Sequence, residues 1–376
     1  MAAASTTPTP PSTMSRIGQS WVWVVPILGV IALVFSWERE LPVLAYILVG
    51  AVLVGVVLSA VHHAEVVAHR VGEPYGSLVL AVAVTVIEVA LIITLMLGKS
   101  SEDASTLARD TAFAAVMITI NGIVGISILV GSLRHNTPRF NSEGAGGALA
   151  VVATLTTLTL VVPSFTVSEP GAQFTPLQLA FVAVAALVLW GAFILLQTGR
   201  HRDFFLPVSK SGKIIDEDTH MEPPSNKATW LSLGLLLVSL VAVVGLAKAM
   251  SPAIEGVVEA AGIPETFVGV VVALVVLLPE GMAATKAAAR NRLQTSLNLG
   301  IGSAMASIGL TIPAIAVASI WLPTPLTLGL GPVQIVLFLL TIAVATLTIV
   351  PGRATRLQGV VHLVLFAAFL FLSATP

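Results

Sequence analysis

Long apolar segments alternate with short polar segments along almost the whole chain. Eleven of the apolar segments approach the ~20 residues that an α-helix needs to cross the hydrocarbon core of a bilayer. This pattern predicts an all-α polytopic membrane protein with eleven transmembrane helices. The predicted spans are residues 20–37, 43–61, 77–97, 111–133, 147–165, 176–197, 229–250, 266–286, 296–320, 332–350 and 357–374.

The polar segments divide these spans into groups. Residues 1–19 are rich in Pro, Thr and Ser, which predicts a disordered cytoplasmic tail. Residues 20–37 form an extra N-terminal helix, and the sequence at its end, FSWERELP, lacks a small-residue cleavage site, so we expect this helix to be retained. The longest polar interruption, residues 198–228, is predicted to be a cytoplasmic linker. It separates a first block at 43–197 from a second at 229–376.

Each block contains five predicted spans. Because five is odd, the second block enters the membrane from the face opposite to that of the first. The chain is therefore predicted to consist of one N-terminal helix and two inverted five-helix repeats, an arrangement found in many secondary transporters.

Composition and charge agree with a membrane protein and set its orientation. Charged residues make up 10% of the chain, against about 25% in soluble domains. Of the 18 Lys and Arg residues, fourteen lie on the N-terminal side of the predicted membrane, which places the N-terminus in the cytoplasm and the C-terminus outside. The net charge of −1 indicates no nucleic-acid partner, and the absence of cysteine excludes thiolate metal sites and disulfides.

Two glutamates lie inside apolar segments. Glu88 is near the middle of one apolar run, and Glu280 directly follows another run and Pro279. A carboxylate at this depth is costly and is retained mainly for function. Pro279 has no backbone donor, so the carbonyl of Val275 loses its helical partner and becomes a free oxygen. Carboxylate and carbonyl oxygens are the ligands that Ca2+ prefers, so the pair predicts a cation site. The alternative for each glutamate is a neutral carboxyl group hydrogen-bonded between helices.

Two segments resemble the repeats of a known family. They are HHAEVVAHRVGEPYGSLVLAVAVTVIEVALI and LLPEGMAATKAAARNRLQTSLNLGIGSAMASIGLTIP, which begin at residues 62 and 277. They are similar to the α-repeats of the calcium/cation antiporter superfamily, and more closely to its cation/proton exchanger branch with bacterial ChaA-type members. The resemblance implies that Glu88 and Glu280 are the ion-binding glutamates. It also pairs Ser303 and Asn121 with family positions, while Thr85 and Leu277 replace two asparagines of the family signature.

Neutral polar residues are expected to complete the cation shell. We expect Thr85 on the face of Glu88, because it lies three residues earlier on the same predicted helix. Asn121, Ser303 and Asn298 are further candidates, although small polar residues inside spans also bond across helices simply to pack them.

A second set of charged residues is predicted on the cytoplasmic side. An entry funnel or a sensing site is one interpretation of this set, since histidine titrates near neutral pH. A solvated charged surface is the other interpretation. The residues are His62, His69, Glu73, Asp216, Glu217 and Asp218.

The two glutamates suggest how transport is coupled. Two carboxylates in a low-dielectric site cannot both stay ionised without compensation. The site is therefore expected to change sides only with protons or a cation bound, which predicts a proton-driven antiporter exporting Ca2+ in exchange for H+. Na+(K+)/H+ exchange by the same site is the alternative, and a cation channel or an intramembrane enzyme is a remote one.

The expected partners follow from this function. They are inorganic cations, protons and the lipid bilayer, with no cofactor and no catalytic residue. The resemblance implies the inner membrane of a bacterium, and the sequence leaves open whether the chain forms a homo-oligomer.

Overall fold

The structure is a computed structural model that describes residues 13–72, 75–98, 101–208, 224–322 and 325–375. The first half of the chain forms the helices α1 (Thr13–Ser36), α2 (Val43–Val71), α3 (Tyr75–Gly98), α4 (Ser101–Met117), η1 (Ile118–Ile123), α5 (Val124–His135), α6 (Ser142–Thr156), η2 (Thr157–Val161), η3 (Val162–Ser164), α7 (Pro176–Thr198) and η4 (Arg202–Phe205). The second half forms α8 (Asn226–Ala260), α9 (Phe267–Ala289), α10 (Leu293–Ala318), α11 (Pro332–Ile349) and α12 (Arg356–Ala374).

The prediction of an all-α polytopic membrane protein is confirmed. Within the described residues, nine helical stretches are long and apolar enough to cross a membrane, and two shorter apolar helices lie at Ser20–Ser36 and Ala81–Leu97. These stretches correspond one to one with the eleven predicted spans. Two of them are composite, because α4, η1 and α5 run on without a break, as do α6, η2 and η3.

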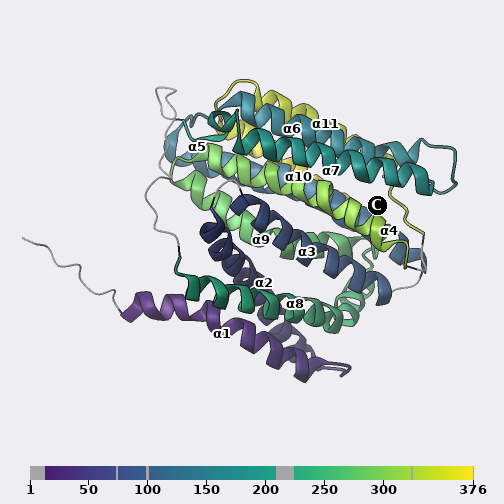
Figure 1. The fold of residues 1–376 in the computed structure, drawn as a ribbon. Helices are drawn as coiled ribbons and strands as arrows, with labels where there is room; N and C mark the ends of the chain where they lie inside the picture. Colours follow the sequence, from purple (N-terminus) through teal and green to yellow (C-terminus); the bar gives the residue numbers. More distant parts are fainter. Residues whose placement is uncertain (1–12, 73–74, 99–100, 209–223, 323–324, 376) are drawn as a thin grey trace, which may run out of the picture.

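The helices surround a central group (Figure 1). α3, α9 and α10 lie in the middle of the bundle, with α1 and α8 on one side and α6, α7 and α11 on the other. Large apolar side chains remain exposed on the outer helices, as expected for surfaces that face lipid. Examples are Val34, Leu177 and Leu357.

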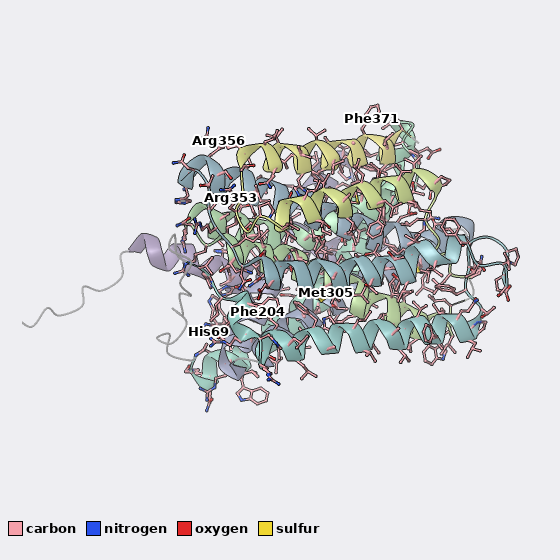
Figure 2. The ribbon with its side chains drawn as sticks, turned by 90° about the horizontal axis from the view of Figure 1, so that it is seen from above. His69, Phe204, Met305, Arg353, Arg356 and Phe371 are labelled. Carbon is pink, nitrogen blue, oxygen red and sulfur yellow. The ribbon has the colours of Figure 1, made fainter. Side chains whose placement is uncertain are left out.

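The bundle has two ends, which we call the basic face and the opposite face. α2 and α9 end at the basic face, and α6 and α12 begin there. Figure 2 places His69, Phe204, Arg353 and Arg356 at this end and Phe371 at the other. Short backbone contacts tie the loops of the basic face together, including the bridge between Arg139 and Arg353.

Three helices extend further than hydropathy predicted. α2 continues to Val71, and α8 continues through Pro252 to Ala260. The fourth span begins at Ala104 instead of residue 111, so it includes Arg109 and Asp110. Hydropathy counts each of these charges as unfavourable. In the fold, Arg109 Nε donates to Asp110 Oδ1 at 2.8 Å, and each charge compensates the other.

The packing of the two blocks is reciprocal. α7 of the first block packs on α10 of the second, and α12 of the second block packs on α5 of the first. Both contacts are close. A Cβ at Gly309 would lie 2.9 Å from Trp190 Cβ, and a Cβ at Gly359 would lie 2.7 Å from the backbone nitrogen of Leu129. Two inverted repeats would produce this exchange of partners, although the repeat itself stays a prediction.

Candidate cation site

A cavity of about 350 Å³ brings together five of the six residues that were expected to bind the cation or protons. It lies between α3, α7, α9 and α10, and both intramembrane glutamates line it. The predicted site residues in its wall are Glu88, Glu280, Thr85, Ser303 and Asn298.

The positions of the wall residues show that the cavity extends toward the basic face. On α7 they run from Trp190 to Gln197, close to the end of that helix. On α10 they begin at Thr295, close to its start. Both of these helix ends lie at the basic face, so the glutamates sit at the inner end of the cavity.

Glu88 is held by a serine on a different helix. Its side chain is only 4% exposed, and Ser307 Oγ donates a 2.5 Å hydrogen bond to Glu88 Oε1. Ser307 also lines the cavity. We did not predict this residue from the sequence, although it follows Ser303 by four positions and therefore lies on the same helix face.

Glu280 has one oxygen free for a ligand. Within the described part of the chain, Glu280 Oε2 is buried without a hydrogen-bond partner. Pro279 precedes it inside the continuous helix α9 and is itself buried. A buried polar atom without a partner is costly, so Glu280 Oε2 is suited to a proton or a cation.

The neutral side chains of the wall differ in how far they are already engaged. The amide of Asn298 is used at both ends, because it donates to Phe205 O at 2.6 Å and accepts from Gln294 at 2.9 Å. Thr85 is nearly buried beside Glu88 on α3, and Ser303 is half-buried. Thr85 and Ser303 are therefore better placed than Asn298 to offer an oxygen.

Asn121 lies outside this cavity, contrary to the expectation that it contributes a ligand there. It sits in the π-helical turn η1, and its amide donates to Thr341 Oγ1 at 2.8 Å. Its Oδ1 lies 3.0 Å from His362 Nδ1, and His362 Nε2 lies 3.1 Å from Thr348 Oγ1. The side chain therefore connects η1 to α11 and α12. The wider π turn changes the helical register, which a sequence alignment does not reveal.

Of the charged residues expected near the cytoplasm, the structure describes His62 and His69, and neither lines the cavity. His69 is exposed at the end of α2, and the His62 ring packs edge-on against His63. His63 itself is buried and bonded to Ser232 and to Val22 O of α1. The remaining members of this set lie outside the described residues: Glu73, Asp216, Glu217 and Asp218.

The chemistry of the cavity is that of a small set of hard oxygens. It offers two carboxylates, hydroxyls from threonine and serine, and two side-chain amides. Among the residues the structure describes, no cluster of three His, Cys, Asp or Glu side chains could hold a metal. Oxygen ligands of this kind are those that hard cations prefer.

Comparisons with known proteins agree with this picture. The model of the family described as sodium/calcium exchanger protein matches residues 19–199 and 231–375. The chain is 34% identical to the sodium-potassium/proton antiporter ChaA of Escherichia coli, over 92% of this chain and 94% of that one. It is 44% identical to the protein y4hA of Sinorhizobium fredii, over 95% and 96% of the two chains.

Solved structures share the fold at low sequence identity. Native YfkE superposes with a TM-score of 0.69 at 18% identity, covering 95% of this chain and 99% of that one. The H+/Ca2+ exchanger CAX gives the same TM-score at 15% identity, covering 96% and 93%.

Proposed function

The chain belongs to the sodium/calcium exchanger protein family, and from that premise we propose that it is a proton-driven cation antiporter of the bacterial inner membrane. The observation that carries the proposal is the single cavity that contains both intramembrane glutamates, Glu88 and Glu280. As a member of a transporter family, the chain moves ions and is not an enzyme.

The two carboxylates provide the coupling between cation and protons. Moving a site of charge −2 through the apolar interior is prohibitive, because even one isolated ion costs on the order of 20 kcal/mol in a medium of ε ≈ 4. Protons or a cation must neutralise Glu88 and Glu280 before the site changes sides. The cation and the protons therefore cross the membrane in opposite directions. Thr85, Ser303 and Ser307 supply neutral oxygens to the bound cation.

Inverted repeats account for the change of sides. We place residues 43–197 in the first repeat and 229–376 in the second, with α1 outside both. In this scheme the cavity described above is open to the basic face, which the positive-inside rule assigns to the cytoplasm. If the two repeats exchanged conformations, the glutamate cavity would close at the basic face and a path would open at the opposite face.

Ca2+ is the cation that we place first. Two carboxylates in one site favour a divalent ion, and the fold is shared with proteins named as Ca2+/H+ antiporters. Na+ or K+ is the second candidate, because the relative in Escherichia coli is named a sodium-potassium/proton antiporter.

The test is proton flux in proteoliposomes that contain the purified full chain. Adding Ca2+, Na+ and K+ separately identifies the cation that drives proton movement. Glu88→Gln and Glu280→Gln are expected to abolish this flux while membrane insertion and the Tm in detergent stay near wild type. Glu259→Gln, which removes an exposed acid on α8, is the matched control and should transport normally. Normal flux in either cavity variant would refute the assignment.

A further inference from the structure

A second cavity lies at the other end of the bundle. Its volume is about 300 Å³, and it lies between α4, α9, α11 and α12. Its wall contains the first residues of α9 and α11 and the last residues of α12, all of which lie at the opposite face. This cavity therefore approaches the centre from the side opposite to the glutamate cavity.

Asp110 is the only acid among the described residues that line this second cavity. It is 4% exposed, and its Oδ1 accepts from Arg109 Nε at 2.8 Å. Its Oδ2 is buried without a hydrogen-bond partner in the described part of the chain, although Thr106 and Gln334 flank the carboxylate. One oxygen is thus held by a charged partner, while the other has only the neutral side chains of Thr106 and Gln334 beside it.

Further oxygens face the same space. Leu372 and Ser373 belong to the last turn of α12, where backbone carbonyls lack helical partners and the helix dipole favours a cation. The Ser373 hydroxyl and the Thr266 side chain also lie in the wall. Carboxylate, carbonyl and hydroxyl oxygens form the ligand set of a small hard cation.

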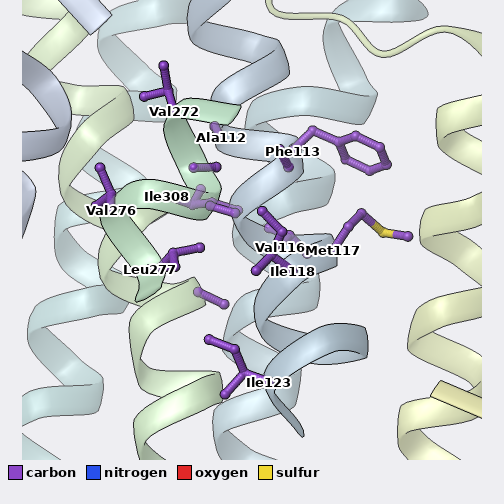
Figure 3. Packing of buried hydrophobic residues seen from close by; sticks show 14 of the residues in the cluster. Ala112, Phe113, Val116, Met117, Ile118, Ile123, Val272, Val276, Leu277 and Ile308 are labelled. Carbon is purple, nitrogen blue, oxygen red and sulfur yellow. The ribbon is translucent and has the colours of Figure 1, made fainter. Parts of the chain in front are cut away.

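An apolar seal separates the two cavities. Figure 3 shows Val116 and Ile118 on the side of α4 and η1 that faces Leu277 of α9, within one buried apolar cluster. α9 also packs closely on α4 beside the second cavity. A Cβ at Gly269 of α9 would lie 2.9 Å from Thr111 N and 3.1 Å from Asp110 C.

We propose that this second cavity is an outer cation-binding vestibule, in which Asp110 Oδ2 is the charged ligand for the cation on its way between Glu88 and the external medium. The proposal rests on the exchanger function above, because it assigns the outer end of the same transport path. Arg109 neutralises Oδ1 and bonds to Gly329 O at 3.3 Å, so the site holds its cation weakly and releases it readily.

Thiol labelling tests the proposal without requiring transport. The chain contains no cysteine, so Ser373→Cys places a single thiol in the vestibule wall. We expect a membrane-impermeant maleimide to label it from outside, and external Ca2+ to slow the labelling. Protection should reach about threefold at twice the Kd, since it scales as 1 + [L]/Kd. Na+ is the second probe, and the control thiol is Ser168→Cys, on the opposite face outside the vestibule.

Adding Asp110→Asn to Ser373→Cys should abolish the protection and leave the labelling itself intact. Asp110→Glu should restore part of it. Protection that persists in Asp110→Asn, or protection by neither Ca2+ nor Na+, would overturn the proposal. Because labelling is independent of turnover, this result is separate from the outcome for Glu88→Gln and Glu280→Gln.

Side-specific kinetics distinguish a ligand from a closing contact. If Asp110 binds cation, Asp110→Asn raises the half-saturating concentration at the outer face by about tenfold and leaves the cytoplasmic value unchanged. If Asp110 only holds the outer side shut, Asp110→Asn favours the outward-open state. The half-saturating concentrations at the outer and cytoplasmic faces then change in opposite directions. The second pattern would overturn the proposal.

Discussion

At the scale of single residues, the structure separates polar side chains that line the glutamate cavity from those that hold helices together. Glu88, Glu280 and Ser307 share one cavity, whereas Asn121 and His362 form a buried network between η1, α11 and α12. Sequence reasoning found both glutamates because an acid inside an apolar run is conspicuous. It assigned Asn121 to the cation shell because an asparagine inside a span has the right chemistry. The direction of its side chain depends on a π turn that carries no sequence signal.

Ser307→Ala should weaken cation binding without disturbing the fold. The Ser307 hydroxyl makes a 2.5 Å hydrogen bond to Glu88, and losing a hydrogen bond to a charged group costs about 1.5–3 kcal/mol. The half-saturating cation concentration should therefore rise by about tenfold or more in a flux assay. Ser319→Ala, at the other end of α10, removes a hydroxyl that bonds only locally and should leave the value unchanged. An unaltered value in Ser307→Ala would contradict the role of Ser307.

Asn121→Ala should lower stability more than cation affinity. It leaves His362 Nδ1 and Thr341 Oγ1 buried without this partner, at a cost of about 1–3 kcal/mol. The Tm in detergent should fall, while the half-saturating cation concentration of the folded protein stays near wild type. A loss of affinity with an unchanged Tm would instead restore Asn121 to the ion site.

At the scale of helices, the eleven spans followed from apolar runs of membrane length, and the errors lie at their ends. The fourth span was predicted to begin at residue 111, because Arg109 and Asp110 are both charged. In the folded protein the two side chains form an ion pair, so the helix extends past them. The sequence alone does not show that this pair forms. Interruptions inside helices, such as the π turns η1 and η2, were not predictable because they arise from packing against neighbouring helices.

Pro279→Ala should stabilise α9 and slow transport. The alanine restores a backbone donor for Val275 O and removes the clash of the proline ring, a gain of up to ~3 kcal/mol. We expect a higher Tm and a lower exchange rate, since the helix beside Glu280 becomes stiffer. Pro252→Ala, inside α8 and away from both cavities, should raise the Tm without slowing transport. Faster exchange in Pro279→Ala would contradict this role for the proline.

Gly309→Ala should separate α7 from α10 and destabilise the wall of the glutamate cavity. The added methyl group would lie 2.9 Å from Trp190 Cβ, and overpacking of this kind costs about 1–3 kcal/mol. The Tm should fall, as measured by thermal unfolding in detergent. Gly234→Ala on α8 adds a methyl group into open space and should not lower the Tm. Equal Tm values for the two variants would argue against close packing at Gly309.

At the scale of the whole molecule, the alternation of the spans fixes which helix ends share a face. Basic residues at that face, Arg353 and Arg356 among them, predict by the positive-inside rule that it lies in the cytoplasm. We therefore expect an N-terminal green fluorescent protein fusion to fluoresce and a C-terminal alkaline phosphatase fusion to be active. The opposite pair of results would invert the chain and exchange the roles of the two cavities.

The seal between the cavities also has an electrical consequence. Along α9, Leu277 in the wall of one cavity follows Val270 in the wall of the other by only seven positions, which is about 10 Å of helix. With water in both cavities, the membrane voltage falls almost entirely across this short stretch, at about 2.3 kcal/mol per elementary charge per 100 mV. A cycle of one Ca2+ against two protons would ignore an imposed voltage, and any other ratio would respond steeply. The dependence of the transport rate on voltage therefore gives the net charge that crosses the membrane in each transport cycle.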